Sequence, residues 1–189
     1  MKICGITSVD DALMAEEAGA DMIGVIAFSQ SPRCVDPVRI RGIFDAIPSL
    51  TRCCVSHEPS AGELDVICAL GPDVIQVPCP IRIPESCRAL VFRSIRPGDP
   101  IHCDADALVV DASHGSGTLF DASYAMSVVR AARVPVFLAG GLTPENVGDA
   151  ARVVQPAGVD VATGVEYAPG KKDRKKVKAF VERAKGEIL

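Results

Sequence analysis

The stretch KICGITSVDDALMAEEAG, residues 2–19, contains one complete strand-and-helix unit. Its apolar start, residues 2–6, predicts a short strand. Ser8 then fits the N-cap of a helix, with Asp11 standing where a capping box carries Glu or Gln. Gly19 predicts the end of that helix, because glycine is favoured just after the last helical turn. The rest of the chain can be compared with this unit.

The same order of apolar run and helix recurs along the chain, which favours an α/β fold. We expect eight strands, over residues 2–6, 21–28, 52–56, 73–77, 89–95, 107–113, 135–141 and 158–164. The later helices are expected over residues 37–47, 61–70, 121–132, 144–154 and 173–185. Residues 78–87 are proline-rich and have room for only a short helix, and residues 96–104 for a turn or one helical turn.

The number and composition of the strands predict a closed barrel. The strands are continuous apolar runs, which is typical of parallel strands covered on both faces. Eight units favour a compact, single-domain (β/α)8 TIM barrel over residues 1–189, with units four and five shortened. An open Rossmann-like sheet is the alternative, but no G-x-G-x-x-G motif follows the first strand.

Composition limits the classes of function. The 189 residues carry a net charge of -4, which argues against general nucleic-acid binding. No apolar stretch approaches the about 18 residues of a membrane span, and the start of the chain does not resemble a secretory leader. The eight cysteines form no C-x-x-C pair, so we expect core thiols such as Cys53, Cys54 and Cys68, no metal and a reduced, cytoplasmic protein. The basic run over residues 171–178 is interpreted as a solvated helix face.

In this barrel the active site lies at the carboxyl ends of the strands, which makes the residues there candidates. They are Cys4 at the end of strand one, Arg33 after strand two, Gln76 in strand four, Arg93 in strand five and Asp111 in strand six. Arg33 could clamp a carboxylate through two parallel hydrogen bonds, or be a surface arginine. The histidines at positions 57, 102 and 114 are interpreted as solvated or structural. Asp160 is expected in the lower half of the barrel without a chemical role, and Glu166 as a cap or a loop ion pair.

Two glycine-containing loops predict a phosphate site. Loops after strands seven and eight often bind phosphate in this fold, because glycine lets backbone amides approach an anion. Helix N-termini add partial positive charge. The expected ligands are Gly140 and Gly141 in the first loop, and Ala162, Thr163 and Gly164 in the second. Simple turn glycines are the alternative, but the paired positions favour a phosphorylated small molecule.

Cys4 and Asp111 form a possible acid–base pair. A carboxylate at the end of an apolar run needs a polar partner or a chemical role. The structural alternatives for Asp111 are a helix cap or an ion pair. Barrel geometry places Cys4 across the same cavity, where a thiol of lowered pKa could act as a base. Gly5 is expected to leave room for substrate beside it. The loop after Asp111 contains Gly115 and Gly117, and is expected to close over the substrate.

Taken in order, these segments resemble the phosphoribosylanthranilate isomerases of tryptophan biosynthesis. The matching pieces are KICGIT (2–7), SPR (31–33), VVDASHGSGTLFD (109–121), VFLAGGLTPENV (136–147) and GVDVATGVEYAPGKKDRKKVKAFV (158–181). The resemblance covers nearly the whole chain. It implies an Amadori rearrangement of a small phosphoribosyl substrate, without a metal or organic cofactor, in a monomer or homodimer.

The resemblance also implies roles for individual residues. Asp111 would be the general acid that opens the ribose ring, and Cys4 the general base that takes the C2 proton. Arg33 would hold the anthranilate carboxylate, and the two glycine-containing loops the phosphate. Substrate contacts are also expected from Gln76, Gly115 and Gly117.

The chain departs from the family pattern after strand four. Family members commonly carry Gln-Leu-His there, whereas this chain has QVPC over residues 76–79. Two alternatives follow. A related sugar-phosphate isomerase of histidine biosynthesis resembles this barrel but carries aspartate at the position of Cys4. A catalytically idle phosphate-binding barrel is supported only by the missing histidine.

Overall fold

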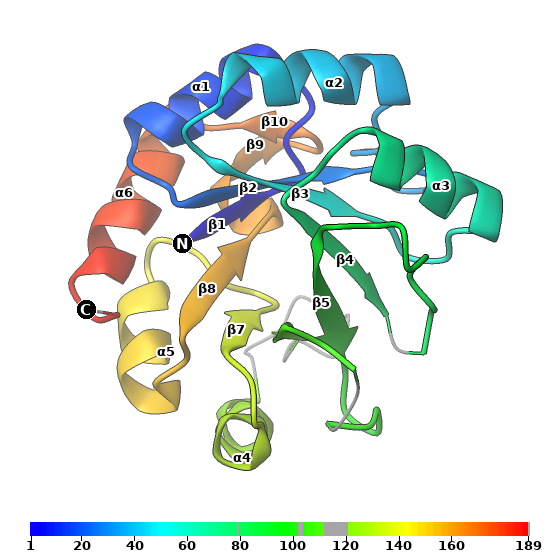
Figure 1. The fold of residues 1–189 in the computed structure, drawn as a ribbon. Coiled ribbons are helices and arrows are strands. Elements are labelled where there is room, and N and C mark those ends of the chain that lie inside the picture. The colour runs from blue at the N-terminus through cyan, green and yellow to red at the C-terminus, as the bar shows by residue number, and fades with distance from the viewer. Residues whose placement is uncertain (79, 102–103, 112–120, 189) are drawn as a thin grey trace.

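The structure, a computed structural model, describes residues 1–78, 80–101, 104–111 and 121–188. Its centre is a closed barrel in which eight parallel strands pair in chain order, and the last strand pairs with the first (Figure 1). The strands are β1 Lys2–Cys4, β2 Met22–Ile26, β3 Thr51–Val55, β4 Val74–Pro78, β5 Leu90–Ile95, β6 Ala107–Asp111, β7 Val136–Ala139 and β8 Gly158–Val161. The predicted closed barrel is therefore confirmed, and the open sheet is excluded.

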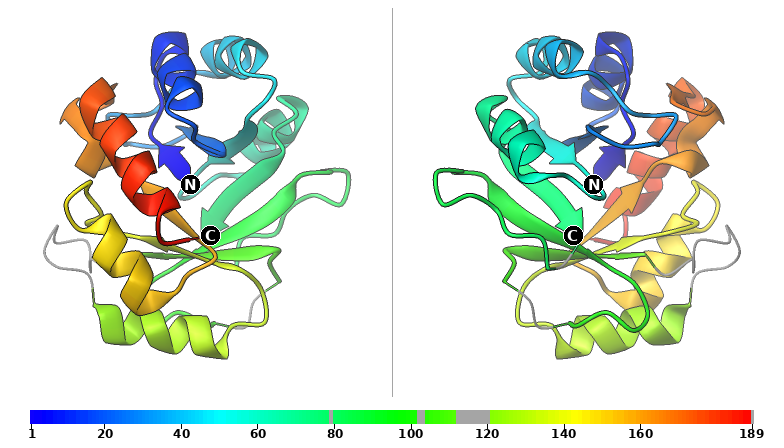
Figure 2. Two further views of the ribbon diagram at one scale, coloured as in Figure 1. Left: turned by 90° about the vertical axis from the view of Figure 1, so that its left-hand side faces the viewer. Right: turned by 90° about the vertical axis from the view of Figure 1, so that its right-hand side faces the viewer.

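Helices cover the outside of the barrel, as the two side views in Figure 2 show. They are α1 Val9–Glu17, α2 Pro37–Ala46, α3 Ala61–Ala69, α4 Ala122–Ala131, α5 Val147–Val154 and α6 Arg174–Lys185. Within the described ranges no helix follows β4 or β5, which confirms the shortened fourth and fifth units. In the same part of the chain, no helix is both long and apolar enough to cross a membrane.

A buried arginine holds the two shortened connections together. Arg93 is 5% exposed, and its guanidinium donates to the carbonyl oxygens of Pro78, Ile81 and Asp104. These bonds tie the connections after β4 and β5 to the outside of the barrel. The sequence places Arg93 among the strand-end candidates, but its side chain does not line the cavity described below. Its role in this structure is to support the loops that replace two helices.

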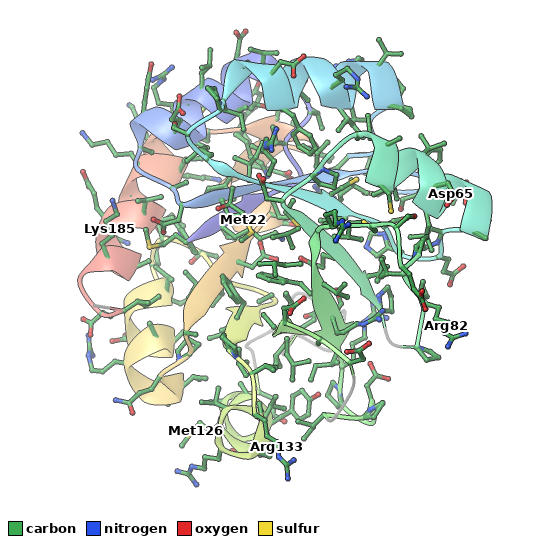
Figure 3. All side chains as sticks on the ribbon, in the orientation of Figure 1. Met22, Asp65, Arg82, Met126, Arg133 and Lys185 are labelled. Carbon is green, nitrogen blue, oxygen red and sulfur yellow. The ribbon has the colours of Figure 1, made fainter. Side chains whose placement is uncertain are left out.

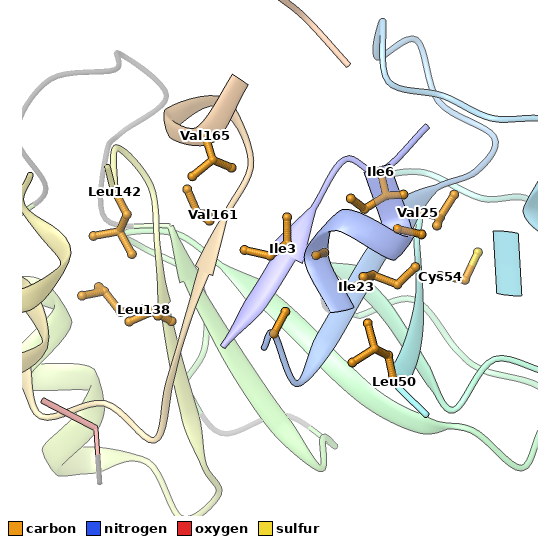
Figure 4. Packing of buried hydrophobic residues seen from close by; sticks show 14 of the residues in the cluster. Ile3, Ile6, Ile23, Val25, Leu50, Cys54, Leu138, Leu142, Val161 and Val165 are labelled. Atoms are coloured by element: carbon orange, nitrogen blue, oxygen red, sulfur yellow. The ribbon is translucent and has the colours of Figure 1, made fainter. Parts of the chain in front are cut away.

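Two packed layers explain the alternation of residues along the strands. Side chains such as Ile3, Ile23 and Leu138 belong to the large cluster between the strands and the helices (Figure 4). Side chains such as Cys4 and Met22 belong to a smaller cluster inside the barrel. Figure 3 shows Met22 near the centre of the molecule and the charged Lys185 at its edge. Successive strand residues point to opposite faces of the sheet. The Cys4 side chain therefore points into the barrel, while that of Ile3 points toward the helices.

The helix starts follow the capping residues of the sequence, with one exception. Ser8 accepts from the backbone amide of Asp11, and Ser60 forms a full capping box with Glu63. Helix α5 begins at Val147, three residues after the predicted start at Pro144. The Asn146 side chain accepts from the Thr143 amide and donates to the Gly141 carbonyl, so it holds these residues in a turn.

A short hairpin between β8 and α6 is absent from the sequence prediction. Strands β9 Glu166–Ala168 and β10 Lys171–Lys172 pair antiparallel, and Gly170 between them has a φ of 72°. This left-handed conformation is easily adopted by glycine and allows the tight reversal. The hairpin brings Glu166 and Lys172 together beside the carboxyl ends of the barrel strands.

Candidate active site

One cavity opens at the carboxyl ends of the barrel strands. Its volume is about 610 Å³, within the usual range for small-molecule sites. The residues that line it include most of the sequence candidates, namely Cys4, Arg33, Gln76, Asp111, Gly140, Gly141, Ala162, Thr163 and Gly164. The topology of the barrel thus brings residues that are distant in the chain to one site.

Cys4 is the last residue of β1 and lies on the cavity wall. Its register partner on β2 is Gly24, where a Cβ atom would lie only 2.8 Å from the Cys4 Sγ. Glycine at that position therefore leaves room for the thiol. Burial raises the pKa of Cys4 above its ordinary value, and the charges of Lys2 and Lys172 oppose that effect. The lowered pKa considered from the sequence is therefore not found: burial outweighs the cations, and only those cations favour ionisation of the Cys4 thiol.

Asp111 is the last residue of β6 and also lines the cavity, where it is half-buried. It follows four buried residues of that strand, as the sequence pattern predicts. The predicted loop residues Gly115 and Gly117, together with His114, lie outside the described residues. Cys4 and Asp111 therefore open into one cavity from two separate strands.

The loops after β7 and β8 form one wall of the cavity, at the place where the sequence predicts a phosphate site; we call them the phosphate-type loops. Gly140 and Gly141 have φ values of 86° and 66°, so both need glycine's conformational freedom. A Cβ atom on Gly164 would lie 1.9 Å from the Leu142 carbonyl oxygen. Glycine at position 164 therefore has a packing role: it lets the two loops touch backbone to backbone. Residues 163–165 form a short 3-10 helix, and the first backbone amides of a helix have no carbonyl partner within it.

Arg33 is held by a carboxylate of the chain itself. Its Nε and Nη2 atoms donate to Glu166 at 2.8 and 2.7 Å, and Lys172 donates to the same carboxylate at 2.9 Å. Burial alone would raise the pKa of Glu166, but the bonds from Arg33 and Lys172 outweigh it and lower that pKa. The predicted two-bond clamp is thus made to Glu166. The Nη2 atom also donates to the Thr163 hydroxyl at 3.4 Å, so a substrate carboxylate would meet the guanidinium at its Nη1 atom.

The position of Gly5 corrects one detail of the sequence interpretation. Gly5 has a φ of 71°, and a Cβ atom there would lie 2.7 Å from the Cδ of Arg33. The space beside Gly5 is therefore filled by the arginine side chain and is not open for substrate. The role of Gly5 is to let the Arg33 side chain pass over the end of β1 and reach Glu166.

Gln76 lines the cavity, and its side chain has a buried acceptor without a partner in the described part of the chain. Its amide nitrogen donates to the Ser94 hydroxyl at 2.9 Å, and the side chain is largely buried. Its Oε1 atom has no hydrogen-bond partner among the described residues. A buried acceptor without a partner costs free energy.

Comparison with known proteins agrees with this geometry. The family model described as N-(5'-phosphoribosyl)anthranilate (PRA) isomerase matches residues 88–183. The chain is 48% identical to the N-(5'-phosphoribosyl)anthranilate isomerase of Methanoregula boonei, over 98% of this chain and 96% of that protein. The chain belongs to the PRA isomerase family. It is accordingly an isomerase of tryptophan biosynthesis.

Solved structures of PRA isomerases share the fold. The enzyme from Thermus thermophilus is 30% identical with a TM-score of 0.83, over 98% of each chain. A phosphoribosyl anthranilate isomerase in complex with reduced 1-(o-carboxyphenylamino)-1-deoxyribulose 5-phosphate is 30% identical with a TM-score of 0.80. That match covers 98% of this chain and 97% of the other. The resemblance stated from sequence motifs is therefore confirmed.

Relative to the PRA isomerase pattern, Pro78 occupies the position at which the family histidine was expected. Its carbonyl oxygen accepts from Arg93, so this position supports the shortened connections. The nearest described histidine at the cavity is His57, whose Nδ1 lies 3.0 Å from the Ser29 hydroxyl. His57 therefore lies at the cavity, and its contact is to a loop serine.

The sequence interpretation missed two lysines beside this PRA isomerase site, whereas Glu166 forms the loop ion pair that was one of its two predicted roles. Lys172 was assigned to a solvated basic run, which is wrong for this residue: its side chain is fully buried against Glu166. Lys2 pairs with Asp160 inside the barrel, and Asp160 lines the cavity. Lys2 and Cys4 are two residues apart on one strand, and that spacing is the signal that places both inside the barrel.

Substitution of Gly164 by alanine tests the contact between the phosphate-type loops. We expect Gly164→Ala to weaken binding of inorganic phosphate and to lower the free energy of unfolding by about 1–3 kcal/mol, because the new methyl group forces the loops apart. Thermal unfolding with and without phosphate measures both effects, and the loss corresponds to about 2–4 °C per kcal/mol.

Gly42→Ala is the matched control for this substitution. Gly42 lies within α2, and a Cβ atom there would meet nothing within 4 Å. Alanine at that position is expected to raise stability by up to about 1 kcal/mol through helix propensity, with phosphate binding unchanged. Unaltered phosphate binding in Gly164→Ala would show that the loop contact does not shape the anion site.

Proposed function

We propose that the chain converts N-(5'-phosphoribosyl)anthranilate into 1-(2-carboxyphenylamino)-1-deoxyribulose 5-phosphate by general acid–base catalysis. The observation that carries this proposal is the shared cavity. A carboxyl group on β6 and a thiol on β1 open into it together with two phosphate-type loops. Family membership supplies the reaction, and this arrangement supplies a residue for each step.

The first step opens the ribose ring. Asp111, in its protonated form, donates a proton to the ring oxygen as the bond from C1 to that oxygen breaks. The lone pair of the anthranilate nitrogen forms a double bond to C1, which gives a positively charged Schiff base. Asp111 is half-buried and lines the cavity, where its carboxyl group can contact the substrate.

The second step moves the C2 proton. The Schiff base acidifies this proton because the electrons of the C2–H bond can flow toward the positive nitrogen. The Cys4 thiolate takes the proton, a C1=C2 double bond forms, and the C1=N electrons return to nitrogen. Tautomerisation of the resulting enol then protonates C1 and leaves a ketone at C2, which is the product.

Binding groups surround these two residues. Gly140, Gly141 and the residues 162–164 hold the phosphate through backbone amides. Arg33 meets the anthranilate carboxylate with the guanidinium edge that Glu166 leaves open, which places the aromatic ring near β1 and β2. Gln76, which also lines the cavity, is a further substrate contact. Gly115 and Gly117 complete this proposal as substrate contacts from the loop after β6.

The cysteines favour the cytoplasm as the compartment. Six cysteines lie in the described ranges, and all six are free thiols. A catalytic thiolate also needs a compartment that keeps thiols reduced.

The decisive experiment is turnover by the unaltered protein. The loss of fluorescence of N-(5'-phosphoribosyl)anthranilate on addition of purified enzyme follows the reaction directly. We expect multiple turnovers without added metal or cofactor, and thermal stabilisation by the reduced product analogue. A protein that binds the analogue but shows no turnover would instead be an idle phosphate-binding barrel.

A further inference from the structure

A buried ion pair lies inside the barrel beneath the cavity. The Lys2 side chain is 0% exposed, and its Nζ donates to Asp160 Oδ2 at 2.8 Å. The two residues are register partners on β1 and β8, so the barrel closure itself brings them together. Removing two charges from water is expensive, and a pair of apolar residues would fill this position at lower cost. The pair therefore needs an explanation beyond stability.

The position of Lys2 relative to Cys4 supplies that explanation. Both side chains enter the barrel from β1, because the residues are two apart on one strand. A Cβ atom on Gly24 would meet the Cys4 Sγ at 2.8 Å and the Lys2 Cε at 3.1 Å. The thiol and the end of the lysine chain therefore share the small space that this glycine leaves open.

The charges around Cys4 do not cancel. The groups that face it are Lys2 from β1, Asp160 from β8, Lys172 from β10, Arg33 from the loop after β2 and the Cys53 thiol from β3. Glu166 of β9 pairs with both Arg33 and Lys172. These described residues include three cations and two carboxylates, so one positive charge remains. A Cys4 thiolate would balance it.

We propose that Lys2 is a positioning residue for the reaction: its ammonium group, shared with Asp160, faces Cys4 from beneath and favours loss of the thiol proton. This inference rests on the proposed role of Cys4 as the base. Burial opposes a thiolate. The charge of Lys2 is the largest of the influences that offset this effect of burial. Asp160 acts in the opposite direction, because its negative charge opposes a second negative charge on Cys4.

Two substitutions make opposite predictions. Lys2→Met keeps the length of the side chain and removes the charge, so the midpoint pH of Cys4 ionisation should rise by about one unit or more. Asp160→Asn leaves the Cys4 thiolate as the remaining counter-ion of Lys2, so that midpoint should fall by about one unit. A purely structural disturbance would slow the reactions of Cys4 at every pH and leave the midpoint in place.

The measurement is the rate of iodoacetamide alkylation of Cys4 between pH 5 and about pH 11, followed by mass spectrometry of the N-terminal peptide. It needs no turnover, so it remains informative if the proposed function fails. Where turnover is present, the acid limb of kcat/KM should move in the same direction as the alkylation midpoint. Lys178→Met is the matched control, because Lys178 is 69% exposed on α6. The midpoint of Cys4 alkylation in this variant should equal that of the unaltered protein.

The outcomes separate cleanly. Opposite shifts in the two variants support the positioning role, and circular dichroism confirms that both variants are folded. If Lys2→Met does not fold, a lowered midpoint in Asp160→Asn supports the role, and an unchanged or raised one overturns it. Unchanged midpoints in both variants, or shifts in one direction, would also overturn it.

Discussion

Replacement of Cys4 by alanine is expected to lower kcat by about 10²- to 10⁴-fold, the usual contribution of a general acid or base. The substitution removes the only atom of residue 4 that can accept the C2 proton. Alanine keeps the backbone pairing of Cys4 with Gly24 on β2, so the fold should survive. The fluorescence assay gives kcat and KM, and circular dichroism checks the fold.

Cys53→Ala is the matched control for this prediction. Cys53 is a fully buried thiol of the same inner cluster, and it does not line the cavity. Because Cys53 does not open into the cavity, its thiol cannot reach the C2 proton. We expect near-normal kcat in Cys53→Ala. Full activity in Cys4→Ala would remove the thiol from the mechanism and leave Asp111 to account for both proton transfers.

Much of this architecture was accessible from sequence because its signals are local. Ser8 and Gly19 limit the first helix, and the apolar run that ends in Asp111 marks a strand. Parallel strands that close in chain order must present their carboxyl ends on one face. That rule alone brings Cys4 and the glycines at 140 and 141 to one cavity. Chain order and strand direction were therefore sufficient for this part of the site.

The remaining features depend on contacts between distant segments. Arg33 and Glu166 are 133 residues apart, and their pairing requires the β9–β10 hairpin that Gly170 allows. Lys172 appears in sequence as one of several adjacent basic residues, and only that hairpin distinguishes it from its exposed neighbours. The ion pair of Lys2 with Asp160 could have been predicted, because a lysine on the inner face of a strand requires a buried anion.

Substitution of Asp111 by asparagine is expected to lower kcat by about 10²- to 10⁴-fold while ligand binding persists. Asparagine has nearly the same shape as aspartate but no acidic proton, so it cannot protonate the ribose ring oxygen. Thermal stabilisation by the reduced product analogue should be kept, because that ligand already has an open chain and does not need the acid. The loss should therefore appear in kcat much more than in KM.

Asp106→Asn provides the control on the same part of the chain. Asp106 directly precedes β6, at the end opposite the cavity, and its carboxylate accepts from the Val91 amide. The asparagine oxygen can keep that bond, so kcat should remain near that of the unaltered enzyme. If Asp111→Asn retained full kcat, ring opening would have to take its proton from another group. If it lost analogue binding as well, Asp111 would hold the substrate in place and would not be its proton donor. The separation of kcat from binding thus decides which of the two roles Asp111 has.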